Sequence, residues 1–229
     1  MLEAKGVSRT FIIDDCPIEA LPPTNLILPD SQSMVILGPS GCGKSTLLSI
    51  LGLLDQPTQG EVWFQNQRID QLNDQERTQM RRNDFGFVFQ RFHLLPVLSA
   101  LENAMMPALL TGQSEEMASK RATELLYSVG LQKKINLQVK NLSGGERQRV
   151  AVARALVHAP KIVLADEPTA NLDQASNELV SNLIFDLTRA NKASLLFVTH
   201  DERLAIKADM VRRMGRKNYE YKISAENSL

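Results

Sequence analysis

The chain lacks the features that define several large classes of protein. It has only two cysteines in 229 residues, and no Cys/His cluster accompanies them, so neither a disulfide framework nor a zinc site is indicated. No apolar run approaches the ~20 residues that cross a membrane, and the first residues lack the apolar core of a secretory signal. The formal net charge is zero, which predicts no nucleic-acid partner. We therefore expect a soluble, cytoplasmic protein.

A complete phosphate-binding pattern is present. Residues 38–45 read GPSGCGKS and match G-x-x-x-x-G-K-S, with a strand-like run before them at 34–37 and a helix-like run after them at 46–51. Glycines let such a loop fold tightly, so that backbone N–H groups and a helix N-terminus point at phosphate oxygens. Lys44 then reaches the β and γ phosphates, and the Ser45 hydroxyl is expected to bind Mg²⁺. We call residues 38–45 the phosphate loop.

Two further signals narrow the class. The apolar run 162–165 predicts a buried strand that delivers Asp166 to the same Mg²⁺ ion, and Glu167 beside it is placed to orient an attacking water. Between these motifs, residues 142–148 read LSGGERQ, which we call the signature segment. Its serine hydroxyl and glycine N–H groups at a helix start form an anion site or, taken alone, an ordinary N-cap.

The order of these motifs resembles the ATP-binding cassette ATPases, from near the start of the chain to about His200. Residues 87–96, 100–103 and 164–173 are similar to the macrolide-exporter and lipoprotein-release group of that superfamily. The resemblance implies an α/β P-loop NTPase fold: a mixed-sheet core, an inserted helical subdomain and an N-terminal antiparallel β subdomain. Within a single domain of 1–229, we expect the core at 1–90 and 160–229 and the helical subdomain at 91–159.

The resemblance also implies a role for each site residue. ATP is expected to contact the ring of Phe11 and the phosphate loop with the next residue: Gly38, Pro39, Ser40, Gly41, Cys42, Gly43, Lys44, Ser45 and Thr46. The expected metal ligands are Ser45, Gln90 and Asp166, and the expected catalytic residues are Glu167 and His200. The residues expected to bind the ATP of a second subunit are Ser143, Gly144, Gly145 and Glu146, with Asp173 coupling the two sites. The alternative for Phe11 is a place in the core.

These roles imply an ATP-hydrolysing subunit that pairs head to tail with a second copy of itself around two ATP. It would work at the cytoplasmic face of a bacterial inner membrane, where a permease docks near residues 90–98, which we call the docking segment. The alternative for each apolar side chain there is burial in the helical subdomain. Lipoproteins, peptides or drugs are the expected cargo, and the alternative function is a non-transport ATPase that signals through a membrane partner. Chromosome and repair ATPases are disfavoured, because the interval 45–142 has no room for a long coiled coil.

Local patterns predict several elements. Strands are expected at 26–28, 34–37, 61–65, 85–89 and 195–198, and a helix at 74–82. A second helix buries the face of Ala118, Ala122, Leu125, Leu126 and Val129 and stops at Gly130. Asp173 is expected to cap a helix that runs towards residue 190. Residues 214–220 replace the family's usual Asp-Gly turn, and 224–229 are expected to form a loose tail.

Overall fold

The computed structural model of the protein describes residues 1–215 and 221–222. Within them the chain divides into two compact units. The first unit combines Met1–Arg81 with the described residues from Ser194 onward, and the second is Arg82–Ala193. The predicted limits of the helical subdomain, 91 and 159, fall inside the second unit and stay a prediction. The predicted tail at 224–229 and most of the atypical segment at 214–220 lie outside the described residues.

An antiparallel sheet begins the first unit and confirms the predicted N-terminal β subdomain. Its strands, in the spatial order β2-β1-β4-β5, are β2 (Cys16–Leu28), β1 (Leu2–Ile13), β4 (Gln59–Phe64) and β5 (Gln67–Arg68). Ile13 pairs with Cys16, which leaves Asp14 and Asp15 as a two-residue turn with φ of 49° and 60°. A left-handed backbone at both turn positions matches the twist of a β-hairpin, so the two strands pair along most of their length.

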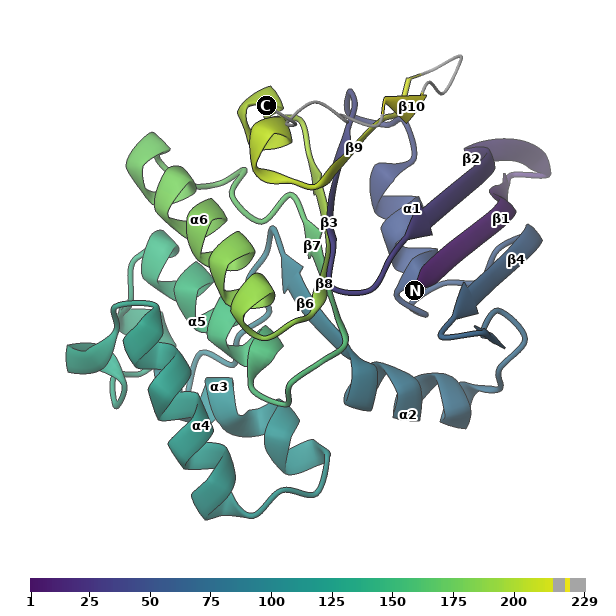
Figure 1. Cartoon of the computed structure of the whole chain (residues 1–229). Helices are drawn as coiled ribbons and strands as arrows, with labels where there is room; N and C mark the ends of the chain where they lie inside the picture. Colours follow the sequence, from purple (N-terminus) through teal and green to yellow (C-terminus); the bar gives the residue numbers. More distant parts are fainter. Residues whose placement is uncertain (216–220, 223–229) are drawn as a thin grey trace, which may run out of the picture. The chain divides into compact units, whose positions relative to one another are not determined.

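A second, mixed sheet of the first unit leads to the phosphate loop. Strand β3 (Ser33–Leu37) runs parallel to β8 (Ser194–Thr199) on one side and to β9 (Met210–Arg213) on the other, and β10 (Tyr221–Lys222) is antiparallel to β9. Every residue of β3 and β8 is buried, which explains why both read as continuous apolar runs. Helix α1 (Lys44–Leu51) follows the loop and contacts β1, β2 and β8 (Figure 1). The 3₁₀-helix η3 (Glu202–Lys207) follows β8.

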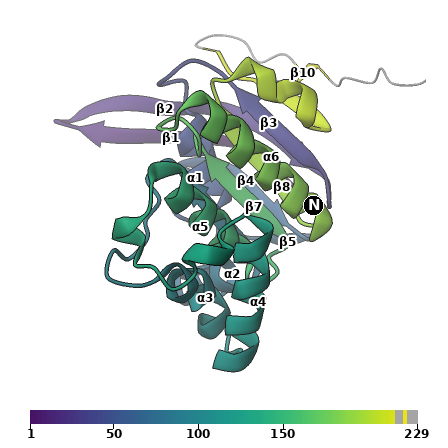
Figure 2. The ribbon, with the colours of Figure 1, turned by 90° about the vertical axis from the view of Figure 1, so that its left-hand side faces the viewer.

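The second unit is built around one buried helix. Strands β6 (Phe85–Phe89) and β7 (Ile162–Asp166) pair in parallel. The helices are α3 (Ala100–Leu110), α4 (Glu115–Ser128), α5 (Gly144–Leu156) and α6 (Gln174–Ala190), with 3₁₀ turns η1 (Gln132–Lys134) and η2 (Val139–Asn141). Helix α5 contacts β6, α3, α4 and α6, and Figure 2 shows α3, α4 and α5 gathered in one bundle. Helix α2 (Asp74–Asp84) spans the boundary between the units.

The predicted apolar face of α4 is confirmed. Its buried residues are Ala118, Ala122, Leu125 and Leu126, and Gly130 adopts a left-handed φ of 73° just after the helix ends. None of the helices in the described part of the chain combines the length and the apolar composition needed to cross a membrane.

Candidate nucleotide-binding site

The phosphate loop lies between β3 and α1, as its sequence pattern requires. Gly41 and Gly43 have left-handed φ values of 79° and 94°, and Gly43 is the N-cap of α1. The loop starts in a tight place, because a Cβ atom on Gly38 would lie 2.3 Å from the carbonyl oxygen of Met214. Gly41 and Gly43 therefore suit the left-handed backbone, and Gly38 suits the close approach of Met214. The N-terminal N–H groups of α1 lie next to the loop.

Lys44 holds its ammonium inside the loop. Its side chain is 6% exposed, and Nζ donates hydrogen bonds to the carbonyl oxygens of Gly38 at 2.7 Å and Pro39 at 2.9 Å. A lysine is buried to this extent only when its charge has partners. Ser45 is exposed at the start of α1, and the sequence-predicted Thr46 is half-buried behind it. The loop thus presents a fixed cation and a hydroxyl at the same helix start.

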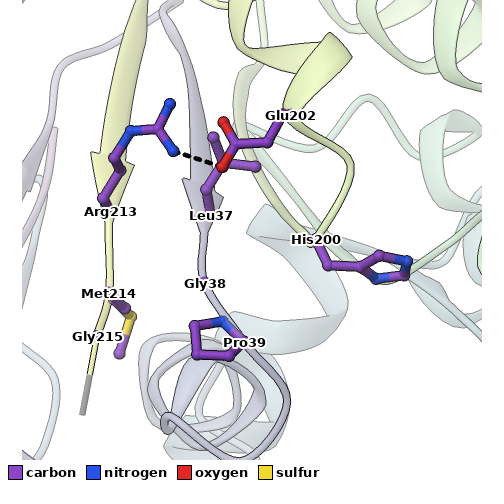
Figure 3. A pocket seen from close by; sticks show the side chains of 8 residues that line it. All are labelled: Leu37, Gly38, Pro39, His200, Glu202, Arg213, Met214 and Gly215. Atoms are coloured by element: carbon purple, nitrogen blue, oxygen red, sulfur yellow. Dashed lines mark hydrogen bonds and ion pairs between the residues drawn. The ribbon is translucent and has the colours of Figure 1, made fainter.

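A pocket of about 490 Å³ adjoins the phosphate loop in the first unit (Figure 3). It is lined by Leu37, Gly38, Pro39, His200, Glu202, Arg213, Met214 and Gly215. Among these residues, Arg213 forms a hydrogen-bonded ion pair with Glu202, and this hydrogen bond lowers the pKa of the Glu202 carboxyl. The structure therefore brings the sequence-predicted His200 to the same pocket as the first residues of the loop.

Phe11 lies on β1 opposite Ile18, and the residue is 37% exposed, so the alternative that Phe11 belongs to the core is wrong. The guanidinium of Arg9 lies 4.5 Å from the centre of the ring and also pairs with Asp55 at 2.9 Å. Sequence reasoning missed Arg9. The sequence feature that could have identified Arg9 is its position two residues before Phe11, because residues two apart on a strand lie on the same face. The role of Phe11 at adenine stays a prediction.

In the second unit, pairing of β6 with β7 places Phe89 opposite Asp166. Gln90 follows directly, and its Nε2 donates to Asn171 Oδ1 at 3.2 Å. The structure thus brings Gln90 and Asp166 to one edge, at the carboxyl ends of two parallel strands. Glu167 comes next and has a left-handed φ of 44°, which is costly for a residue with a side chain and is typical of functional positions. Both carboxylates are half-buried.

The signature segment forms the start of α5. Ser143 is the N-cap: its Oγ accepts the N–H of Glu146 at 3.3 Å, and Glu146 Oε2 accepts the N–H of Ser143 at 3.0 Å. Gly144 and Gly145 are the first two helical residues, so the predicted helix start is confirmed. The N-terminal N–H groups of this helix provide the electrostatic setting for an anion.

The two glycines of the segment differ in the space around them. A Cβ atom on Gly145 would lie 2.9 Å from Oγ of Ser176 on α6, which is too close. A Cβ atom on Gly144 would meet only ordinary contacts, the nearest at 3.7 Å. A side chain at position 145 would therefore make Ser176 shift, whereas nothing among the described residues requires glycine at position 144.

Asp173 is the N-cap of α6, as predicted. Its Oδ1 accepts the N–H of Ser176 at 3.0 Å, and this hydrogen bond lowers the pKa of the carboxyl. Because Ser176 also lies against Gly145, the start of the Asp173 helix and the signature segment are neighbours within the second unit. A link from Asp173 to a second subunit stays a prediction.

The docking segment presents apolar side chains at the surface, with Leu95 47% and Val97 70% exposed. A pocket of about 370 Å³ lies against it, lined by Phe92, His93, Leu94, Pro96, Val139, Lys140 and Arg147. The alternative of burial is therefore wrong for Leu95 and Val97, while Phe92, Leu94 and Leu98 are half-buried.

Helix α5 holds the backbone of the docking segment and of the strand before it. Arg154 donates to the carbonyl oxygens of Phe92, at 2.8 Å, and of His93. Gln148, fully buried, donates to the carbonyl oxygen of Phe89 at 3.1 Å. Sequence reasoning missed Gln148 and Arg154. The available signal for Arg154 was its position seven residues after Arg147, two turns along one helix face.

Comparisons with known proteins agree with this geometry. The family model described as ABC transporter matches residues 21–170. The lipoprotein-releasing system ATP-binding protein LolD of Legionella pneumophila (strain Lens) is 46% identical over 211 residues, covering 92% of this chain and 93% of that protein. LolD of Xanthomonas campestris pv. campestris (strain 8004) is 47% identical over 208 residues, covering 91% and 84%.

Solved structures are similar as well. The dimeric structure of MJ0796, a bacterial ABC transporter cassette, matches with a TM-score of 0.88 and 38% identity over 96% of this chain and 98% of that one. A dimeric structure of the same cassette in a post-hydrolysis state bound to ADP and Pi matches equally well.

Proposed function

Since this chain belongs to the ABC transporter family, we propose that it is the motor subunit of a lipoprotein-releasing transporter. It is an ABC-type ATP hydrolase, and its fold is that of the dimeric ABC cassettes. In the proposed cycle, two copies close head to tail around two ATP, hydrolyse them and reopen. A separate inner-membrane permease, docked on the cytoplasmic side, converts this closure into movement of the cargo.

The phosphate loop is the proposed ATP site of each copy. Loop N–H groups and the start of α1 hold phosphate oxygens, and Lys44 supplies a cation whose stem is already fixed by burial. Phe11 would stack on the adenine. The Arg9 guanidinium on its ring supports this role, because it fixes the ring at the surface instead of in the core.

The proposed metal ligands suit Mg²⁺. Ser45 offers a hydroxyl, Asp166 a carboxylate and Gln90 an amide oxygen, and hard oxygen donors of this kind are the ones that Mg²⁺ prefers. The orientation of Gln90 fits as well, because its Nε2 donates to Asn171 and its Oε1 is the remaining acceptor. When bound with ATP, the ion would neutralise phosphate charge and hold the γ-phosphate in place for attack.

Catalysis by this set of residues rests on position and charge. Glu167 accepts a hydrogen bond from the attacking water and orients it, and its left-handed backbone supports this role because such strained positions are typical of functional sites. His200 donates to the γ-phosphate, and its place beside the first residues of the loop supports that role. These groups act by holding the reactants in line and by stabilising the charge that develops on the phosphate.

The signature segment is proposed to act in trans, with Ser143, Gly144 and Gly145 meeting the γ-phosphate of the ATP held by the second copy. Glu146, also expected in this site, is proposed to take part only through the cap that it forms with Ser143. The observation that carries this proposal is that a Cβ atom on Gly144 would meet only ordinary contacts, so the packing of the described residues does not require glycine there. A glycine that the chain itself does not need is explained by a ligand that approaches closely from outside. Asp173 is proposed to link the two sites, since its helix packs against the same segment.

The docking segment is proposed to receive a cytoplasmic helix of the permease. Its exposed Leu95 and Val97 supply apolar contact area, and Arg154 ties its backbone to the helix that begins at the signature segment. A displacement of the docking segment would therefore move α5. The names of the LolD relatives favour lipoproteins as cargo over peptides or drugs, and they do not favour the alternative of a non-transport signalling ATPase.

Co-purification from native membranes tests this function. The tagged chain, extracted with its membrane in mild detergent, is expected to bring down a permease in fixed ratio, and ATPase turnover is expected to rise when the permease is present. Val97→Asp should abolish the capture, because it puts a charge into the apolar contact. Met117→Asp is the matched control: Met117 is also an exposed apolar residue of the second unit, at 63%, but lies on α4. Equal capture by both variants would contradict the docking assignment.

A further inference from the structure

The signature segment contains a carboxylate, that of Glu146, at the helix start where the phosphate is proposed to bind. Glu146 is the third residue of α5, and its side chain is 16% exposed. A carboxylate at this place stabilises the helix start, but it also repels a triphosphate that approaches the same N–H groups. The chain must therefore either turn the carboxylate away or neutralise it.

The structure shows that it neutralises the carboxylate. Glu146 Oε2 accepts the backbone N–H of Ser143 at 3.0 Å, which holds the carboxylate at the cap. Glu146 Oε1 lies 2.5 Å from Nζ of Lys134. The hydrogen bond from Lys134 is the largest of the effects that lower the pKa of Glu146, so this carboxylate stays ionised and paired.

A short stretch of hydrogen-bonded backbone positions Lys134 beside Glu146. After the left-handed Gly130, the 3₁₀ turn η1 ends at Lys134, whose N–H donates to the carbonyl oxygen of Leu131 at 2.9 Å. Its own carbonyl oxygen accepts the N–H of Leu137 at 3.0 Å. Hydrogen bonds on both sides fix the backbone of Lys134, so the ammonium is presented to Glu146 from a defined position.

We propose that Lys134 is a positioning residue for the in-trans phosphate site: it neutralises Glu146 and holds the cap, so that the Ser143 hydroxyl and the N–H groups of the two glycines can donate to the γ-phosphate of the ATP held by the second copy. This inference rests on the proposed function of the signature segment. Lys134 itself acts through Glu146 and needs no contact with ATP.

A double-mutant cycle separates this role from a merely structural one. The parent is the full chain carrying Glu167→Gln, in which ATP is expected to trap a dimer, and the readout is the ATP concentration that gives half-maximal dimer in sedimentation velocity. Lys134→Met should raise that concentration roughly three- to tenfold, the size of a partly screened charge effect at a helix start. Lys134→Arg should restore the parent value.

The decisive comparison is made with Glu146→Gln, because glutamine keeps the capping hydrogen bond and removes the charge. In that background, Lys134→Met should leave the half-maximal ATP concentration within twofold. An equal rise in both backgrounds, a loss of thermal stability without any change in ATP response, or loss of the dimer on Glu146→Gln alone would each overturn the proposal. If the parent itself forms no dimer with ATP, the in-trans site fails and the inference falls with it, which distinguishes the two failures.

Discussion

Gly144 and Gly145 are adjacent in sequence but meet different constraints, and single substitutions should separate them. Gly144→Ala should fold with an unchanged melting temperature, since its Cβ meets only ordinary contacts. Its ATPase turnover should nevertheless fall by at least about tenfold, because the methyl group obstructs the approach of the partner's phosphate. Gly145→Ala, the matched control, should lower the melting temperature through its collision with Ser176. Full turnover by Gly144→Ala would remove this glycine from the ATP site.

His158 should make the stability of the fold depend on pH. Burial lowers the pKa of its imidazole, whose Nε2 lies 3.1 Å from the carbonyl oxygen of Phe85 and whose Nδ1 has no partner among the described residues. The unfolded chain then binds the proton more readily than the folded chain. The free energy of unfolding therefore has its full value above about pH 6.5 and decreases as the pH falls below that value. Urea unfolding of His158→Gln at about pH 7.5 and pH 5.5 should show a smaller fall than the native chain. Equal falls in the two proteins would contradict this account.

At the scale of residues, sequence patterns predicted the caps and missed the long-range partners. Ser143 and Asp173 were predictable as N-caps because a cap depends on the residues three positions further on. The contacts of Lys134 and Arg154 were not, because their partners lie 12 and 62 residues away in sequence. Both are long cations, whose surface position is the default expectation until the fold is known.

Among the elements, α5 connects the docking segment to the signature segment, and Arg154 provides the test. Arg154→Met removes charge-assisted hydrogen bonds to Phe92 and His93 and should lower the free energy of unfolding by about 2–4 kcal/mol. It should also reduce the stimulation of ATPase activity by co-purified permease more than it reduces basal turnover.

The matched control for that change is Arg149→Met on the same helix. Arg149 also donates to a backbone carbonyl oxygen, that of Val129, which lies outside the docking segment. This variant should lose stability yet keep the stimulation by the permease. If Arg149→Met and Arg154→Met reduce the stimulation equally, α5 does not transmit motion from the docking segment.

Element prediction succeeded where one face or both faces of an element are buried. Strand β6 and the helices α4 and α6 were predictable from their apolar patterns and caps, and so was β8 to within one residue. The long hairpin of β1 and β2 was mostly missed, since Pro17, Pro22 and Pro23 argue against strand pairing. Only its last residues, 26–28, were predicted, and the Asp14–Asp15 turn was the overlooked signal.

At the scale of the whole molecule, the order of motifs along the chain predicted the fold class because each motif needs a fixed local setting. A phosphate loop requires a strand before it and a helix after it, and the structure provides β3 and α1. The division of the site between two copies could not be derived from the physics of one chain. The expectation of a shared site rests on the resemblance to a family, and a measurement on a mixture of two variant chains tests it.

That measurement is subunit complementation. Lys44→Ala removes the phosphate-binding cation and Gly144→Ala blocks the signature segment, so each variant alone should have almost no ATPase activity. Mixed at equal concentration, they should recover up to about a quarter of the native activity, since half of the dimers pair unlike chains and one site in each of these is intact. A mixture that dimerises with ATP but stays as inactive as its components would contradict a site shared between two copies.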